Sequence, residues 1–568
     1  MKPKQNLIQR CLLGTMLLLL PGVAQAQLSY TDNGDGTATI TGCDPNYNGA
    51  LAIPDTTNGL TVTSIGDGAF FGCTKLANIT IPSSITNIGI AAFNSCLTLT
   101  NVAIPASVIS IGDYAFFYCT NLTAIAVDAA NPSYSSADGV LFNKDRTILM
   151  QFPFGKTGSY LIPGSVTGIA DEAFGMNDHG QYPFSYSACA GLTNLIVPGS
   201  ITNIGDYAFS HCAGLTCVTI SNGVASLGVE AFSWCSDLTS ITIPDSVTSI
   251  GQEAFYYSGL TNVTIPDSVT NFGVGAFAVC SSLTSVTIRD GVTSIGEAGF
   301  NFCTNLTSIT IPDSVTSIGE RAFWFCTALT NVSISSNVTN VGPYAFSACS
   351  SLINITVNPD NESYSSVDGV LFNNDRTVLI QFPGGKGGGY MVPDGVIIIG
   401  GYAFGSYDPY GYSFFYLPSG MNLTSINFPG SVTTIGEEVF YSLTNLTGFY
   451  FEGNAPVDAG NMFYVFYDFD VTLYYLPGVT GWDTGFAGLS TKLWLPQMNR
   501  ASFREPTNQF GFNINWARGE TVVVEACTNL ANPDWQPVQT NTLTTGSAYF
   551  GDPQWTNFPA RFYRLRSP

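Results

Sequence analysis

Few residues of this chain are arranged for acid–base or metal chemistry. Its 568 residues include two histidines, His179 and His211. His179 follows Asp178 in a polar stretch, where we favour a solvated loop over the remnant of a site, and His211 occupies the repeat position that holds Trp234 and Tyr257 elsewhere, which favours packing. Neither stands in a metal-ligand spacing such as His-Glu-x-x-His. The sequence therefore predicts no catalytic residue, no metal site, no cofactor and no enzymatic activity.

Cysteine is the second residue type with chemical potential. In an exported protein, 14 cysteines would usually indicate disulfides. Ten of them share one position of a sequence repeat: Cys73, Cys96, Cys119, Cys189, Cys212, Cys235, Cys280, Cys303, Cys326 and Cys349. Equivalent side chains on stacked coils run parallel about 4.8 Å apart, whereas bonded Cβ atoms need roughly 3.5–4.5 Å. We therefore predict a ladder of buried thiols. Cys217, beside Cys212, is the best candidate for a bridge, and Cys43 and Cys527 are left open.

The repeat that carries these cysteines organises the chain. Residues 306–328, LTSITIPDSVTSIGERAFWFCTA, recur with small changes from about residue 60 to residue 448, mostly in steps of 23. The alternation in LTSITI predicts a short half-buried strand, which Pro312 ends because proline cannot donate to a ladder. Val315 and Ile318 are expected to face inward from a second extended segment. A single helical turn over residues 322–326 would then close the coil.

Two interruptions of the repeat recur 230 residues apart. Residues 131–152 (NPSYSSADGVLFNKDRTILMQF) match residues 361–382 (NESYSSVDGVLFNNDRTVLIQF), which indicates that a large block was duplicated. In each copy two apolar runs flank a short polar connection, the pattern of a β-hairpin. Each copy is followed by an insertion rich in Gly, Pro and Tyr, at residues 175–191 and 405–422, which predicts an ordered loop.

The phrase LxxIxIPxxVxxIGxxAFxxCxx resembles the BspA-like class of bacterial leucine-rich repeats over roughly residues 60–450. This resemblance implies a β-rich solenoid of 23-residue coils with a parallel sheet and short helical turns. Members of the class are typically secreted or surface-exposed and act in adhesion to host proteins, other cells or surfaces. The resemblance implies the same location and role for this chain. The residues that contact ligands vary within the class, so no ligand-binding residue can be assigned from it.

The flanking segments complete the predicted domain organisation. Basic residues before an apolar run and the small residues Ala24-Gln25-Ala26 predict a signal peptide over residues 1–26. After residue 495 the alternation of apolar and polar residues predicts a small β-sandwich, which resembles C-terminal β-domains of exported bacterial proteins. The expected parts are a signal peptide at 1–26, an N-terminal cap at 27–60, the solenoid at 61–448, a C-terminal cap at 449–495 and the β-sandwich at 496–568.

Charge and hydropathy restrict the partners. Removal of residues 1–26 takes away Lys2, Lys4 and Arg10, which leaves 15 basic against 40 acidic residues and a formal charge of −25. Phosphate polyanions such as nucleic acids are therefore not expected as partners of this acidic chain. No apolar stretch after the signal peptide reaches the ~20 residues needed to cross a bilayer. We expect a secreted or cell-surface protein without a transmembrane segment in the mature chain.

Candidate ligand contacts lie where the repeats differ or face outward. Strand threonines that point away from the core form a hydroxyl-lined face, which could bind a protein or glycan or could be merely a soluble, β-favouring surface. Aromatic residues in the two insertions could supply contact area for a partner or could fold onto a neighbouring coil. The candidates are Thr242, Thr264, Thr287, Thr310, Tyr182, Phe184, Tyr186, Tyr407, Tyr410 and Tyr412. The predicted function is non-enzymatic protein binding or adhesion, and the alternative is extracellular polysaccharide binding.

Overall fold

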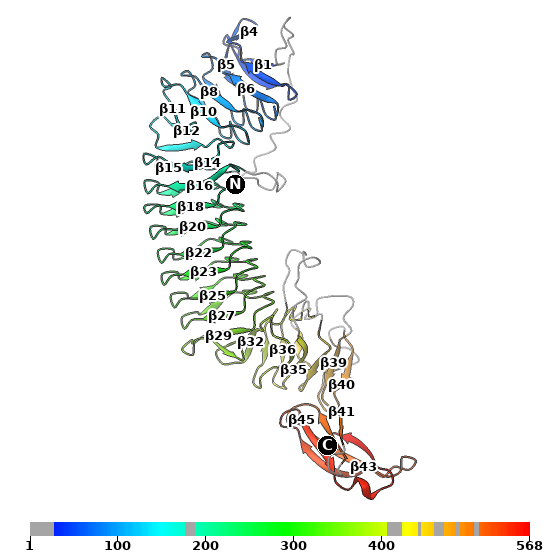
Figure 1. Ribbon diagram of the computed structural model, residues 1–568. Helices are drawn as coiled ribbons and strands as arrows, with labels where there is room; N and C mark the ends of the chain where they lie inside the picture. The colour runs from blue at the N-terminus through cyan, green and yellow to red at the C-terminus, as the bar shows by residue number, and fades with distance from the viewer. Residues whose placement is uncertain are drawn as a thin grey trace. The chain divides into compact units, whose positions relative to one another are not determined.

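The computed structural model describes residues 28–175, 188–405, 423–440, 443, 445–458, 471–482, 486, 489–504 and 510–568. The chain divides into two compact units. The first runs to Leu352 and includes Val357–Ser363, and the second comprises Ile353–Thr356 and Tyr364–Pro568. Strand β29 (Asn354–Val357) falls at this division. Within the first unit the coils follow one another in sequence order from blue to green (Figure 1).

One coil shows how the repeat sequence folds. Its longer strand is β25 (Ser308–Thr310), in which Ile309 is buried while both neighbours are exposed. Its shorter strand is β26 (Ser317–Ile318), with Ile318 buried and Ser317 half-buried. Val315 is fully buried between the two strands. The predicted half-buried strand and the inward-facing second segment are therefore confirmed.

The part of the coil after Gly319 differs from the prediction. Residues 320–325 form hydrogen-bonded turns, so the expected single helical turn is wrong. Arg321 and Phe325 have positive φ angles of 54° and 62°, a conformation that costs about 1–2 kcal/mol per residue for L-amino acids. Because residues with positive and negative φ follow one another in this turn, every second backbone N–H points toward the next coil. The Phe323 N–H, for example, donates to the Ala345 carbonyl at 2.8 Å. A continuous intercoil ladder offsets the strain, and a helix would have kept these donors within one coil.

The longer strands of the first unit pair in parallel in three ladders, β3 to β10, β14 to β20, and one that begins at β22. These strands are β3 (Gly49–Ala52), β6 (Leu76–Thr80), β8 (Asn101–Ile104), β10 (Ala124–Val127), β14 (Gly158–Leu161), β16 (Leu192–Val197), β18 (Cys217–Ile220), β20 (Ser240–Thr242), β22 (Asn262–Ile265), β23 (Ser285–Ile288), β25 and β27 (Asn331–Ile334).

The shorter strands form a second set of parallel ladders in the same unit. Two antiparallel pairs, β1 with β2 and β4 with β5, stand at its start. These strands are β1 (Leu28–Asp32), β2 (Thr37–Cys43), β4 (Thr56–Thr57), β5 (Leu60–Ile65), β7 (Asn87–Ile88), β9 (Ser110–Ile111), β15 (Gly168–Ile169), β17 (Asn203–Ile204), β19 (Ser226–Leu227), β21 (Ser249–Ile250), β24 (Ser294–Ile295), β26 and β28 (Asn340–Val341).

The first interruption of the repeat contains three antiparallel strands, β11 (Tyr134–Ala137), β12 (Val140–Asn143) and β13 (Ile148–Gln151). Strand β13 then pairs in parallel with β15, so the hairpin joins the shorter-strand ladder. The turn between β11 and β12 has positive φ at both Asp138 and Gly139, as a type I′ hairpin turn requires. The Asp-Gly pair was an available signal for this additional hairpin, which the sequence analysis missed.

The second unit repeats the interruption and contains two parallel ladders of its own. Its strands before the C-terminal domain are β30 (Tyr364–Val367), β31 (Val370–Asn373), β32 (Val378–Gln381), β33 (Gly388–Met391), β34 (Ile398–Ile399), β35 (Leu423–Phe428), β36 (Thr434–Ile435), β37 (Gly448–Phe451), β38 (Val457–Asp458), β39 (Thr472–Tyr475) and β40 (Thr491–Leu493).

The C-terminal domain is a small antiparallel sandwich. One sheet has the order β41 (Gln497–Arg504), β42 (Phe510–Asn515) and β45 (Ser547–Asp552). The other has the order β44 (Gln536–Thr542), β43 (Thr521–Cys527) and β46 (Phe562–Arg566), and a single turn of 3-10 helix, η3 (Trp555–Asn557), precedes β46. Phe512, Ile514, Val522 and Val524 are fully buried between the sheets. The predicted fold class, a solenoid followed by a β-sandwich, is confirmed.

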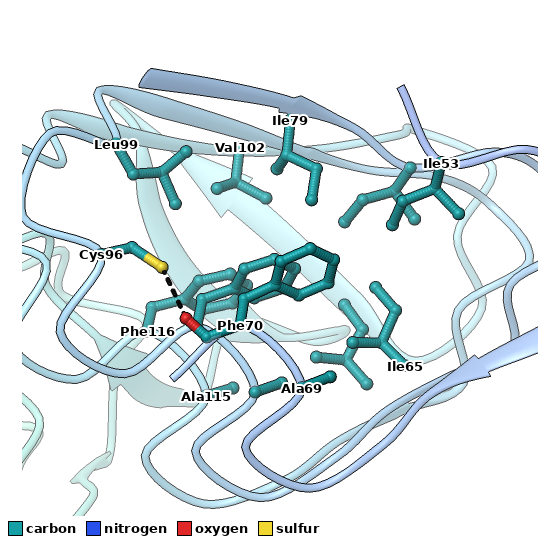
Figure 2. Close-up of a cluster of buried hydrophobic side chains, with 14 of the residues drawn as sticks. Ile53, Ile65, Ala69, Phe70, Ile79, Cys96, Leu99, Val102, Ala115 and Phe116 are labelled. Atoms are coloured by element: carbon teal, nitrogen blue, oxygen red, sulfur yellow. Dashed lines mark hydrogen bonds between the residues drawn. The ribbon is translucent and has the colours of Figure 1, made fainter. Parts of the chain in front are cut away.

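A column of phenylalanines fills the centre of the coils. The rings of Phe70 and Phe93 stack with centroids 5.0 Å apart, and those of Phe93 and Phe116 follow at 5.5 Å. Figure 2 shows Phe70 and Phe116 in this column, with Ile79, Leu99 and Val102 on the strand side of the core. Each Phe ring thus completes the burial of the ring in the coil before it.

The ten repeat cysteines are buried free thiols, which confirms the predicted ladder. Eight of these sulfurs donate to the carbonyl of the Phe in the preceding coil, as Cys96 Sγ does to Phe70 O at 3.2 Å (Figure 2). The suggested Cys212–Cys217 bridge is wrong: both residues are free, and Cys217 is only half-buried at the start of β18, while Cys212 is fully buried. A side chain on the outer face of a strand does not reach a thiol in the core.

Replacement of Phe70 by Ala should destabilise the first coils, because it opens a cavity in the column. We expect a cost of about 3–5 kcal/mol in the local free energy of opening, the usual range for a buried Phe. Hydrogen exchange of the amides of Phe93 and Cys96 measures this change. Phe71→Ala is the matched control, since the Phe71 side chain is 54% exposed. Equal effects of the two substitutions would contradict the packing role of the column.

Candidate functional site

The four candidate threonines occupy one outward-facing column of the longer strands. In β20, β22, β23 and β25 exposed and buried residues alternate, and Thr242, Thr264, Thr287 and Thr310 are all exposed. Cα pairing places Thr264 opposite Thr287, and Thr242 opposite Thr219 of the preceding strand. The predicted outward orientation of these side chains is therefore correct. Whether they contact a ligand stays a prediction.

A second set of threonines shows which hydroxyls serve the scaffold. Thr284 Oγ1 donates to the carbonyl of Thr261 in the preceding coil at 3.0 Å, and Thr330 Oγ1 donates likewise to Thr307 at 3.1 Å. The hydroxyls of the four candidate threonines make no such bond to any residue that the structure describes. Their donors and acceptors are therefore available at the surface.

The same column becomes apolar toward the first interruption. Leu161 of β14 pairs with Ile196 of β16, and Ile196 in turn pairs with Thr219. Leu161 is 62% exposed and Ile196 is 44% exposed. Sequence reasoning did not single out these two residues, although they hold the register position of the candidate threonines. An outward face that combines apolar and hydroxyl side chains matches the composition of protein recognition surfaces.

A pocket of about 350 Å³ lies at the first interruption of the repeat. Its lining residues come from the coil before the interruption, from the hairpin and from the coil after it: Ile111, Gly112, Asp113, Tyr114, Ala115, Phe116, Phe117, Leu141, Met150, Gln151, Ala170, Asp171 and Glu172. The hydroxyl of Tyr114 donates to Glu172 Oε1 at 3.2 Å, and Glu172 is largely buried. Burial, followed by the negative charge of Glu172, raises the pKa of Tyr114 to about 12. The pocket therefore combines carboxylates with an aromatic wall.

The duplicated block does not preserve this acidity. At an offset of 230 residues, Tyr114 corresponds to Tyr344, but Asp171 corresponds to Gly401 and Glu172 to Tyr402. Three carboxylates line the pocket at the first interruption when Asp113 is included, and that residue corresponds to Pro343. The chemistry of the first copy is thus specific to that copy.

The remaining sequence candidates divide into two groups. His211 is buried, and its ring stacks on that of Trp234 at 5.5 Å, which confirms its packing role. His179 and the loop aromatics lie outside the described residues: Tyr182, Phe184, Tyr186, Tyr407, Tyr410 and Tyr412. In the part of the chain that the structure describes, no three His, Cys, Asp or Glu side chains are grouped to hold a metal ion.

The C-terminal domain carries a smaller pocket of about 250 Å³. Arg561 lines it and pairs with Asp552, with its Nε 2.8 Å from Asp552 Oδ2, while its guanidinium lies over the Phe558 ring at 4.3 Å. Arg564 and Arg566 both bind Glu525, and these hydrogen bonds hold the pKa of Glu525 below its usual range. The basic end of the chain is thus paired with carboxylates inside the domain.

Comparison with known proteins identifies the repeat. A family model described as the BspA type leucine rich repeat region matches residues 49–147, 180–284, 273–385 and 410–468. A leucine-rich repeat protein from Bacteroides ovatus is 24% identical over 76% of this chain and 94% of its own, with a TM-score of 0.46. A leucine rich cell surface protein from Faecalibacterium prausnitzii is 26% identical over 75% and 93% of the two chains, with a TM-score of 0.37. None of the curated proteins compared with the sequence matches it.

Hydropathy gives one further observation on the described residues. None of their helices has the length and apolar character to cross a membrane.

Replacement of Glu172 by Gln should lower the pKa of Tyr114 from about 12, because it removes a negative charge that disfavours the phenolate. The pKa should stay above the ordinary tyrosine value, since burial is the larger cause. Near-ultraviolet titration of each protein, with the matching Tyr114→Phe variant subtracted, isolates this residue. Glu253→Gln is the control and should leave the titration unchanged. A Tyr114 pKa that stays the same in Glu172→Gln would contradict the contact.

Proposed function

Because the chain belongs to the BspA-type leucine-rich repeat family, whose model matches more than half of its length, we propose that it is an exported, non-enzymatic recognition or adhesion protein. Residues 1–26 act as its signal peptide, and the mature protein is secreted or held at the cell surface. Its partners are proteins, which it engages with the outward face of the longer strands and with the aromatic loops of the two interruptions.

The observation that carries this proposal is the exposed column on β14 to β25. Its side chains follow one another at the ~4.8 Å spacing of strands within two ladders, β14 to β20 and β22 to β25, so each ladder offers a row of side chains to an extended partner. Leu161 and Ile196 supply apolar contact area, and Thr242, Thr264, Thr287 and Thr310 supply hydrogen-bonding groups. The loop residues Tyr182, Phe184, Tyr186, Tyr407, Tyr410 and Tyr412 add rigid aromatic contacts in this proposal.

Polysaccharide binding is the second candidate function, and the hydroxyl part of the same column favours it. Thr264 and Thr287 lie opposite each other and keep their hydroxyls available, which suits the hydroxyl groups of a sugar chain. A glycan array separates the candidates. Retention of the protein on defined oligosaccharides supports the second function, and retention only on proteins supports the first.

The double substitution Thr264→Arg and Thr287→Arg should weaken partner binding at least tenfold, since two long charged side chains would cover the column. The measurement is capture of partners from an extracellular-matrix extract by the immobilised protein, with quantification by mass spectrometry. Thr293→Arg is the matched control, because Thr293 is exposed on the segment that precedes β24 instead of on this column. Capture that is the same for all three proteins would remove the column from the proposal.

Deletion of residues 496–568 tests the proposed export role of the C-terminal domain. If this domain directs sorting, the truncated protein should move from the cell surface to the medium or remain inside the cell. Fractionation followed by immunoblotting measures the location, and the Phe71→Ala full-length variant controls for expression. An unaltered distribution would contradict a sorting role and leave the domain as an addition to the solenoid.

A further inference from the structure

We propose that Cys43 and Cys73 form a disulfide that fastens the N-terminal cap to the first coil when a small disulfide oxidant such as oxidised glutathione is present. The inference rests on the contacts of the cap and not on the proposed function of the outward face. Neither cysteine has a part in the recognition surface described above.

The two thiols meet at one backbone atom. Cys43 Sγ lies 3.6 Å from the carbonyl oxygen of Asp44, and Cys73 Sγ lies 3.9 Å from the same oxygen. Cys43 ends strand β2, and Cys73 belongs to the turn of the first full coil. Both pack in the same core cluster, where Cys73 is fully buried and Cys43 is partly buried.

The geometry that keeps the other repeat cysteines apart does not hold here. From Cys96 onward, each Sγ in the early coils donates to the carbonyl of the Phe one coil earlier, as Cys96 does to Phe70 and Cys119 to Phe93. Cys73 is the first rung and uses the carbonyl of Asp44 instead. Cys43 lies 30 residues before Cys73, not 23, and belongs to a hairpin strand. The two Cβ atoms are therefore not held in the parallel, one-coil spacing that prevents bonding along the ladder.

Access favours an ordered exchange. The partly exposed Cys43 thiolate attacks oxidised glutathione, forming a mixed disulfide and releasing one glutathione thiolate. The Cys73 thiolate then attacks the Cys43 sulfur and releases the second glutathione, so two protein thiols are oxidised while one glutathione disulfide is reduced to two thiols. The hydrogen bond with Cys73, followed by burial, raises the pKa of the Cys43 thiol, so the exchange should be faster at alkaline pH.

The cross-link would hold the segment that begins the stack. The loop from Cys43 to Cys73 contains β3, β4 and β5, and β3 and β5 pair with β6 and β7 of the following coils. Closing this loop covalently restricts the unfolded cap and so disfavours its local opening. The first coil is where this matters, because no earlier coil covers its core.

The test is peptide mapping of the full-length protein after equilibration in oxidised or reduced glutathione. Trypsin does not separate the two cysteines, since no Lys or Arg lies between them, but cleavage before Asp35, Asp44, Asp67 and Asp113 does. We expect residues 35–43 joined to residues 67–112 only in the oxidised sample, with fragmentation locating the bond at Cys73 and not at Cys96. Hydrogen exchange of β1 and β2 should also slow at least tenfold on oxidation.

Two variants make the result decisive. Cys43→Ser should abolish both the joined peptides and the oxidation-dependent slowing, whereas Cys217→Ser should leave both intact, although Cys217 is equally half-buried. The proposal is supported if the joined peptides appear in the wild-type protein and in Cys217→Ser but not in Cys43→Ser. Free thiols at both positions after oxidation, a persistent glutathione adduct at Cys43, or a bond from Cys43 to any other cysteine would overturn it.

Discussion

The structure depends on one constraint: each coil must place its backbone against an almost identical backbone one strand spacing away. A glycine that recurs at one position of most coils shows how close this approach is. A Cβ added to Gly319 would lie 2.6 Å from the backbone nitrogen of Glu297, and one added to Gly112 would lie 2.5 Å from that of Ile90. A side chain at these two positions would collide with the backbone of the preceding coil. The repeat of 23 residues follows from the need to return to this point in every coil.

From this approach the other interactions follow in register. The Phe rings stack about 5 Å apart, since that is the spacing that the backbones impose, and their carbonyls become acceptors for the cysteine sulfurs of the next coil. A terminal coil has a neighbouring coil on one side only, so other residues must shield its open core side from solvent. In the second unit the indole of Trp482 donates to the Gly453 carbonyl, and that of Trp516 donates to the Trp494 carbonyl. Trp482 packs in the core of the last coils, whereas Trp516 packs in the core of the C-terminal sandwich.

Sequence reasoning predicted the solenoid, the inward residues and the thiol ladder because all three follow from the hydrophobic period. It failed where the residue type does not indicate the backbone conformation. Arg321 and Phe325 adopt positive φ, although neither is a residue that favours it, because the intercoil hydrogen bonds outweigh the local preference. For the candidate site, the outward threonines could be predicted from alternation. The pocket beside Glu172 could not, since it depends on three segments that meet only in the folded chain.

Comparison of the two copies of the duplicated block distinguishes residues that the scaffold requires from residues that can differ at the surface. Asn131 and its counterpart Asn361 are both buried, and each side chain donates to two carbonyls of an earlier segment. Losing either would leave buried carbonyls unsatisfied, so both copies retain the residue. At the position of Glu172, by contrast, the second copy has Tyr402. The two interruptions therefore share a frame but present different charges, and a partner that depends on the carboxylates of the first would find no equivalent in the second.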